Sequence, residues 1–140
     1  MLCITKKFRF EAAHALLNYN GPCKNIHGHS YELLVSVTGT KDPESGMVMD
    51  FKLLKSIVKE EFLDKIDHAL IINTQQAASE LYRTYTGKIF EMRSEPSAEN
   101  MVELFAELIT SKLPAYCKIY RIKLFETESS YVEWFNDELI

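Results

Sequence analysis

A cluster of histidines near the N-terminus has the residue types and the spacing to hold a metal ion. His27 and His29 are separated only by Gly28. Because side chains of an extended segment alternate between two sides, both imidazoles point to the same side. His14 ends an earlier apolar segment, and a chain that turns back would place it opposite the other two. Three neutral imidazoles that leave one coordination position open form a known catalytic zinc arrangement. The sequence therefore predicts a metal site with His14, His27 and His29 as ligands.

Zn²⁺ is the favoured ion at this site. A non-haem iron site would need a carboxylate beside two histidines, and the neighbouring sequence provides none. A single histidine is more often a surface or hydrogen-bonded core residue, but the His-Gly-His spacing directs two rings to one place.

Cys23, which precedes this pair by a short polar stretch, has three open interpretations. It could be a small buried hydrophobic residue, which is the usual role of a free cysteine. It could be a fourth ligand that closes a structural zinc site. It could instead be a catalytic thiolate whose pKa is lowered by a nearby cation. Its polar neighbours argue against burial, and the other two interpretations remain open on the residues alone.

Three further residues could take part in chemistry. Asp67 and His68 are adjacent, and a carboxylate beside an imidazole can fix its tautomer and raise its basicity. The simpler interpretation of this pair is a polar helix end, where the helix dipole favours a histidine. Glu126 ends an apolar segment and could accept two N–H donors from an amino-pyrimidinone ring, although it could equally be a solvated glutamate, and Glu128 is a near alternative.

The elements that must position these residues follow from the hydrophobic pattern. Residues 2–14 and 27–40 alternate as strands and are joined by a turn-rich segment, so they form an antiparallel pair. Asp50 is a good N-cap for a helix that continues to about Lys65. Ser97 is the N-cap of a second helix, which Pro114 ends. Residues 116–126 and 130–136 are the last two strands.

Residues 73–95 are polar and weakly periodic, so they are predicted to form a long loop with a short helix near Ala77–Tyr82. The expected order is β-β-α-α-β-β. It predicts an α+β fold with an antiparallel four-stranded sheet and two helices on one face. The 140 residues are expected to form a single domain, 1–140. The aromatic residues of the last strands are expected in the core or in subunit contacts.

Composition limits the possible partners and compartments. The net charge of −4 argues against a general nucleic-acid binder. The N-terminus has no continuous apolar region of the signal-peptide kind, and no apolar run is long enough to span a membrane. The three cysteines are an odd number with no obvious pairing, which fits a reduced, cytoplasmic protein.

The motifs together resemble the 6-pyruvoyl-tetrahydropterin synthase family, and within it the bacterial enzymes that form 6-carboxy-tetrahydropterin for queuosine. All four histidines fall on family motifs, which are distributed along the chain. The matching segments are Phe10-Glu11-Ala12-Ala13-His14, Cys23-x3-His27-Gly28-His29, Gly46-Met47-Val48-Met49-Asp50-Phe51, Asp67-His68-Ala69-Leu70, Pro96-Ser97-Ala98-Glu99-Asn100 and Phe125-Glu126-Thr127.

The resemblance implies a role for each candidate residue. His14, His27 and His29 match the zinc ligands, and Cys23 matches the catalytic thiol. Asp67 and His68 match its proton-relay partners, and Glu126 matches the anchor of the pterin ring. The implied fold is a tunnelling fold (T-fold), in which subunits join their sheets into a barrel. The implied assembly is a homohexamer, a dimer of trimers, with active sites between subunits.

The implied substrate is 7,8-dihydroneopterin triphosphate. Three residues separate Cys23 from His27, a spacing that resembles the carboxy-forming enzymes, whereas the pyruvoyl-forming enzymes carry a longer gap. The chain departs from the compact bacterial pattern in the length of residues 73–95, in its final segment and in Ser97, where the family usually has threonine. A pyruvoyl synthase, a zinc hydrolase and a non-catalytic pterin-binding module remain alternatives. Lys24 is a candidate for contact with the triphosphate.

Overall fold

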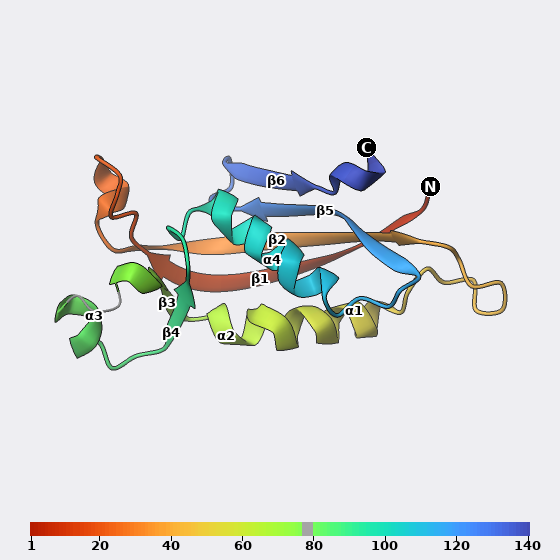
Figure 1. The fold of residues 1–140 in the computed structure, drawn as a ribbon, viewed down its shortest axis with the longest axis horizontal. Helices are drawn as coiled ribbons and strands as arrows, with labels where there is room; N and C mark the ends of the chain where they lie inside the picture. Colours follow the sequence, from red (N-terminus) through yellow and green to blue (C-terminus); the bar gives the residue numbers. More distant parts are fainter. Residues whose placement is uncertain (77–79) are drawn as a thin grey trace.

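A six-stranded sheet in the order β4-β3-β1-β2-β5-β6 forms the centre of the molecule (Figure 1). The computed structural model describes residues 1–76 and 80–140. The strands are β1 (Cys3–His14), β2 (His27–Gly39), β3 (Ala69–Asn73), β4 (Ile89–Met92), β5 (Cys117–Phe125) and β6 (Tyr131–Phe135). The helices are α1 (Phe51–Val58), α2 (Asp64–Ile66), α3 (Glu80–Thr84) and α4 (Ala98–Thr110), and the π-helical segment η2 (Lys59–Leu63) joins α1 to α2. The short 3-10 turns are η1 (Pro22–Lys24), η3 (Thr74–Gln76) and η4 (Asp137–Leu139).

The long antiparallel pair β1 and β2 forms as predicted. Its register places His14 opposite His27, and Ala12 opposite His29. Burial alternates along β1, where the even-numbered side chains from Phe8 to His14 are buried. One face of the sheet is therefore apolar and carries the histidines, whereas the other face carries charged residues such as Arg9 and Glu32.

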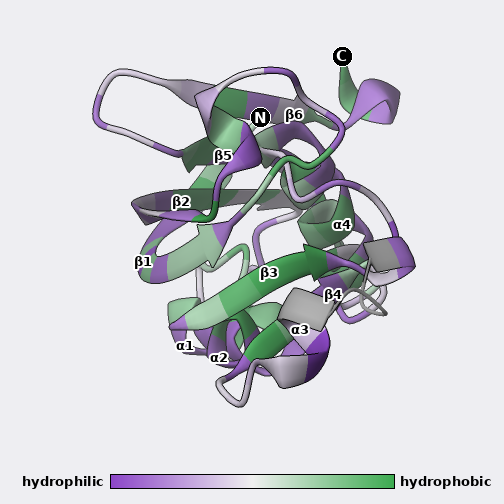
Figure 2. Cartoon of the chain, turned by 90° about the vertical axis from the view of Figure 1, so that its left-hand side faces the viewer, coloured by the Kyte–Doolittle hydropathy of each residue, from purple (hydrophilic) through white to green (hydrophobic). Residues whose placement is uncertain are grey.

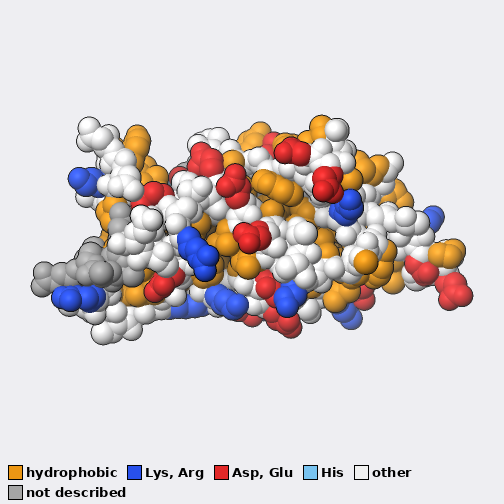
Figure 3. All heavy atoms as spheres, viewed as in Figure 1, with side chains coloured by type: hydrophobic (Ala, Val, Ile, Leu, Met, Phe, Trp, Pro, Cys, Tyr) orange, Lys and Arg blue, Asp and Glu red, His pale blue; other side chains and the backbone are white. Residues whose placement is uncertain are grey.

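The two predicted helices begin at the predicted caps. The Asp50 carboxylate accepts a hydrogen bond from the Lys52 N–H at 2.7 Å. The Ser97 hydroxyl accepts from the Asn100 N–H at 3.3 Å. Both helical segments pack into one core with the apolar face of the sheet, and Phe62 stacks on Phe105 with a ring-centroid distance of 4.0 Å. Acidic and basic side chains are interspersed over the outer surface of this layer (Figure 3).

The sheet differs from the expected one by two additional strands. β3 pairs in parallel with β1, and β4 pairs in parallel with β3, so the sheet is mixed rather than wholly antiparallel. All five residues of β3 are buried, and the strand is hydrophobic over most of its length (Figure 2). A strand buried on both faces shows no alternation, which is the reason that the pattern did not reveal it.

Residues 73–95 are therefore more ordered than the expected loop. They contain the turn η3, the helix α3 and the strand β4. The predicted short helix is present at Glu80–Thr84; the part of that prediction on residues 77–79 lies outside the described residues. Tyr82 of α3 packs on Leu70 and Ile72. Their neighbour Ile71 belongs to the main core, so α3 covers the opposite face of β3. No helix within the described ranges is long and apolar enough to cross a membrane.

Candidate active site

The three predicted ligands converge in the structure. One ligand atom from each of His14, His27 and His29 lies within 4.8 Å of the other two. His14 is buried, and the other two are half-buried. The strand register produces this cluster, because His14 and His27 are directly paired and His29 lies one pleat further along the same face.

The hydrogen bonds of the His14 and His27 rings leave one nitrogen of each ring available to bind a cation. Nδ1 of His14 lies 2.6 Å from the Pro96 carbonyl oxygen, and Nδ1 of His27 lies 2.7 Å from the Asn25 carbonyl oxygen. A carbonyl can only accept, so both Nδ1 atoms carry the proton and both Nε2 atoms present lone pairs. Those two Nε2 atoms are 3.1 Å apart. Two lone pairs at that distance repel unless a cation lies between them, and a tetrahedral zinc site separates its nitrogens by about 3.3 Å.

The third ring, that of His29, lies beside the carboxylate of Glu126. Nε2 of His29 is buried, makes no hydrogen bond within the described part of the chain, and lies 3.6 Å from an oxygen of Glu126. Burial lowers the pKa of His14 and of His29 below the usual value, and the Glu126 carboxylate opposes that shift in both. Burial therefore favours the neutral form of these two imidazoles, which is the form that binds metal. The donor set fits a divalent ion such as zinc.

Glu126 rather than Glu128 faces the cluster. It lies in the turn between β5 and β6, where its N–H donates to the Ser130 carbonyl at 3.0 Å. Its side chain lines a cavity of about 250 Å³ together with Ser97. Glu128 lines a separate depression on the charged face of the sheet. A carboxylate beside both a cavity and a metal-binding cluster can orient a ligand there.

Cys23 lies in η1, half-buried, and does not belong to the cluster of metal-binding groups found among the described residues. Its backbone carbonyl accepts a hydrogen bond from the Leu16 N–H at 2.8 Å, which fixes the loop beside the end of β1. This placement gives no support to a closed site with four protein ligands. The interpretation of Cys23 as a catalytic thiol stays open.

Asp67 and His68 lie just past α2, against β1. Oδ1 of Asp67 accepts hydrogen bonds from the Glu11 N–H at 3.0 Å and from Nδ1 of His68 at 3.0 Å. His68 has a φ of 62°, a left-handed conformation that is uncommon for a residue other than glycine. Strain of this kind persists only where the surroundings enforce it, and it is found most often at functional sites.

A pocket of about 490 Å³ lies beside the Asp67–His68 pair, and His68 lines it together with residues on the face of the sheet opposite to the metal-binding histidines, such as Glu11 and Ser30. Its volume is typical of small-molecule sites. Gly28 and Ala13 form part of its wall, so small residues leave this space open, and Glu11, Ser30 and Tyr85 add polar atoms. Within the described residues, no hydrogen bond or ion pair joins the Cys23 thiol to Asp67 or His68.

Comparison with known proteins supports the resemblance. A family model described as 6-pyruvoyl tetrahydropterin synthase matches residues 3–137. The chain belongs to the 6-pyruvoyl tetrahydropterin synthase family. It is therefore an enzyme of a lyase-type family whose members act on pterins and form oligomers.

Similar sequences carry a more specific name. A protein of Haemophilus influenzae named 6-carboxy-5,6,7,8-tetrahydropterin synthase is 35% identical over 141 residues, covering 96% of this chain and 99% of its own. A protein of the same name from Rickettsia bellii is 31% identical over 137 residues, covering 95% and 99% of the two chains.

Solved structures support the fold. The 6-pyruvoyl tetrahydropterin synthase of Caenorhabditis elegans has a TM-score of 0.73 at 25% identity, over 97% of this chain and 96% of its own. An uncharacterized protein of Wolinella succinogenes has a TM-score of 0.78 at 20% identity, over 97% and 98%. The T-fold prediction is thus confirmed.

Two features of the site were not predicted from the sequence. The Pro96 carbonyl, which orients His14, is a backbone group and leaves no mark on the pattern. Tyr31 packs on the His14 and His29 rings, with centroids 6.3 and 5.6 Å away, and its hydroxyl is buried without a partner among the described residues. Burial raises the pKa of Tyr31, and Glu126 adds to that shift. Tyr31 continues the odd-numbered alternation of His27 and His29, so the signal for it was present.

Proposed function

We propose that this chain is a zinc-dependent lyase that converts 7,8-dihydroneopterin triphosphate and water to 6-carboxy-5,6,7,8-tetrahydropterin, with release of acetaldehyde and triphosphate, in the queuosine pathway. The observation that carries the proposal is the convergence of three imidazoles, one ligand atom from each within 4.8 Å of the others, in a chain whose relatives bear that name. The three-residue gap between Cys23 and His27 supports the carboxy product over the pyruvoyl product.

Each candidate residue has a defined task in this reaction. His14, His27 and His29 hold the zinc ion, which supplies Lewis-acid chemistry by withdrawing charge from the oxygens of the substrate side chain. Cys23, as a thiolate, takes and returns protons on that side chain, and His68 and Asp67 relay them. Glu126 accepts N–H donors of the pterin ring and fixes its position.

Among the described residues the contacts of Asp67 and His68 do not include Cys23, which supports a site shared between subunits. We propose a homohexamer in which the thiol of one subunit meets the relay pair of another. The outer strands β4 and β6 support assembly, because the edges of a sheet offer unpaired backbone groups. Exposed aromatic side chains on β6, Tyr131 and Phe135, also fit a subunit contact. A cytoplasmic location is part of the proposal, in keeping with three cysteines that are all free.

The products decide between the candidate reactions. Zinc-loaded protein is incubated with 7,8-dihydroneopterin triphosphate, and the products are identified by mass spectrometry. The proposal requires 6-carboxy-tetrahydropterin and acetaldehyde. The pyruvoyl compound without acetaldehyde would instead support the second candidate, 6-pyruvoyl-tetrahydropterin synthase, which the similarity to the C. elegans enzyme favours. Phosphate release alone would indicate a hydrolase, and binding without product would indicate a pterin-binding module.

Cys23→Ala is the matched variant for this assay. It is expected to keep its zinc and to lose turnover by about 10²–10⁴-fold, the usual contribution of a proton-transfer group. Unchanged turnover in this variant would contradict the role of the thiol.

A further inference from the structure

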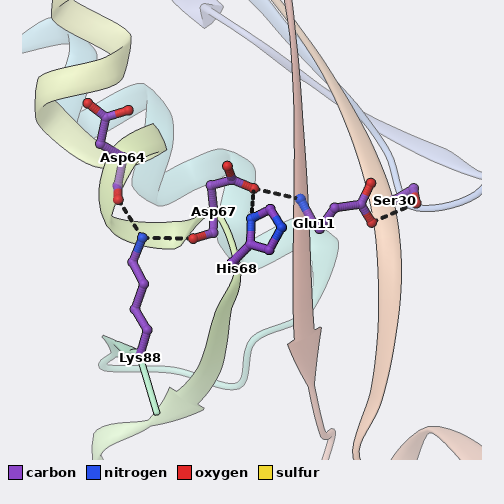
Figure 4. A network of polar contacts seen from close by, with 6 residues as sticks. All are labelled: Glu11, Ser30, Asp64, Asp67, His68 and Lys88. Atoms are coloured by element: carbon purple, nitrogen blue, oxygen red, sulfur yellow. Dashed lines mark hydrogen bonds and ion pairs between the residues drawn. The ribbon is translucent and has the colours of Figure 1, made fainter.

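The peptide group between Asp67 and His68 is held at both ends, and Figure 4 shows the bond that Lys88 makes to its carbonyl. Its N–H, from His68, donates to the Glu11 carbonyl at 2.6 Å. Its carbonyl, from Asp67, accepts from Nζ of Lys88 at 2.7 Å. The same ammonium group donates to the Asp64 carbonyl at 2.6 Å. The plane of this peptide is therefore fixed by β1 on one side and by Lys88 on the other.

This plane controls both side chains of the proposed relay pair. The torsions on its two sides are ψ of Asp67, at 125°, and φ of His68, at 62°. A left-handed φ in a non-glycine residue is unfavourable, so other contacts must maintain it. If the peptide turned, the His68 ring would leave its position 3.0 Å from the Asp67 carboxylate and its place in the pocket wall.

Lys88 is itself placed by the sheet. Its carbonyl accepts a hydrogen bond from the Leu70 N–H at 2.9 Å, immediately before β4 pairs with β3. Its side chain then reaches back over the end of α2. Carbonyls at a helix C-terminus lack intrahelical partners and carry the negative end of the dipole, so an ammonium group suits them. A lysine at a helix end usually adds a little stability. Lys88 differs because one of its two acceptors is the carbonyl next to His68.

We propose that Lys88 is a positioning residue, which holds the Asp67–His68 peptide in the orientation that directs His68 into the pocket. The inference rests on the proposed function for the relay role of the pair. Lys88 is not a catalytic residue, since its ammonium group is directed at backbone carbonyls of its own chain.

Three variants test this role in the zinc-loaded protein. Lys88→Met removes the two hydrogen bonds and keeps the length of the side chain. Lys88→Arg keeps a donor that carbonyls can accept from. Lys59→Met is the control, because Lys59 lies on the same helical run and pairs with the Asp64 carboxylate at 3.5 Å, away from the Asp67–His68 peptide.

We expect Lys88→Met to lower kcat by about ten- to a hundredfold, with KM within about twofold of the original, because misplacing a reacting group costs turnover more than binding. Lys88→Arg should recover most of the lost kcat, and Lys59→Met should match the unmodified protein. An unchanged kcat in Lys88→Met would overturn the proposal, and so would equal losses in Lys88→Met and Lys59→Met.

A second readout does not depend on turnover. The chain has four histidines, so NMR spectra of protein with isotope-labelled histidine give four sets of ring signals. Lys88→Met should move the His68 signals, assigned from a His68→Ala spectrum, and leave the three metal-cluster histidines in place. Movement of all four would indicate a general loss of structure and refute a specific positioning role. If the unmodified protein turns over no pterin substrate, the proposed function fails, whereas the His68 signals still test the positioning.

Discussion

Removing one metal ligand should cost a large and calculable part of the metal affinity. His27→Ala is the most informative change, because His27 is half-buried and so its loss disturbs the core less than loss of the buried His14. Apparent zinc-binding energies of about 10–16 kcal/mol, spread over four ligands, give roughly 2.5–4 kcal/mol for each ligand. The expected loss in affinity is therefore about 10²–10³-fold.

The assay is competition for zinc between the protein and a chromophoric chelator at fixed pH, because protons compete with metal for imidazole. His68→Ala is the matched control, since it removes the one histidine outside the cluster and should bind zinc with unchanged affinity. Cys23→Ala is the third arm, and it should also keep its zinc. The reasoning is refuted if His27→Ala binds within about threefold of the unmodified protein, or if the control loses as much affinity as His27→Ala. A comparable loss in Cys23→Ala would make the thiol a fourth ligand.

The remaining predictions concern assembly and stability. Cys23→Ala and His68→Ala subunits are refolded together into mixed oligomers. If each site joins two subunits, random mixing leaves both groups intact in about a quarter of the sites, so about a quarter of the activity should return, while each variant alone stays inactive. No recovery would place both groups of a site in one chain. Tyr31→Phe should leave the free energy of unfolding unchanged or raise it by up to about 1 kcal/mol, because it removes a buried hydroxyl without a partner among the described residues. Chemical denaturation measures this change, and a loss above about 1 kcal/mol would show that the hydroxyl has a hydrogen-bond partner. Burial raises the pKa of the Cys117 thiol above its ordinary value of 9.0, so its contribution to stability is complete below that pH and is lost as pH rises through the folded pKa. Denaturation between about pH 8 and 10 should therefore show a steeper loss in the unmodified protein than in Cys117→Ala, and equal slopes would contradict the assignment.

The metal cluster could be predicted from the sequence because its geometry is local. Two of the ligands lie on one strand with a period of two, and the third lies on the adjacent strand of a hairpin-like pair. Alternation and antiparallel pairing are enough to bring these side chains together. The helix caps Asp50 and Ser97 were predictable for the same reason, because each acts on backbone groups within a few residues of itself.

The placement of Asp67 and His68 could not be predicted in this way. It depends on the parallel pairing of β3 with β1, which aligns Ala69 with Ala12 and so places the preceding residues beside Glu11. A parallel pairing joins segments far apart in the chain, and a strand buried on both faces has no alternating pattern to reveal it. The sequence identified the pair through family motifs, but not the strand that positions it.

The same strand explains why the relay pair needs support from residues outside the motifs. β3 starts directly after His68, so the chain must change from a helix to a buried strand within two residues, Asp67 and His68. That abrupt change is made through the left-handed backbone of His68, whose N–H donates to the Glu11 carbonyl. Lys88 donates to the Asp64 and Asp67 carbonyls, which the helix end leaves without intrahelical partners. The strand pairing of β4 brings Lys88 to this point. The segment that the pattern presented as a loop therefore contributes to the candidate site directly, through the hydrogen bond from Lys88 to the carbonyl that precedes His68.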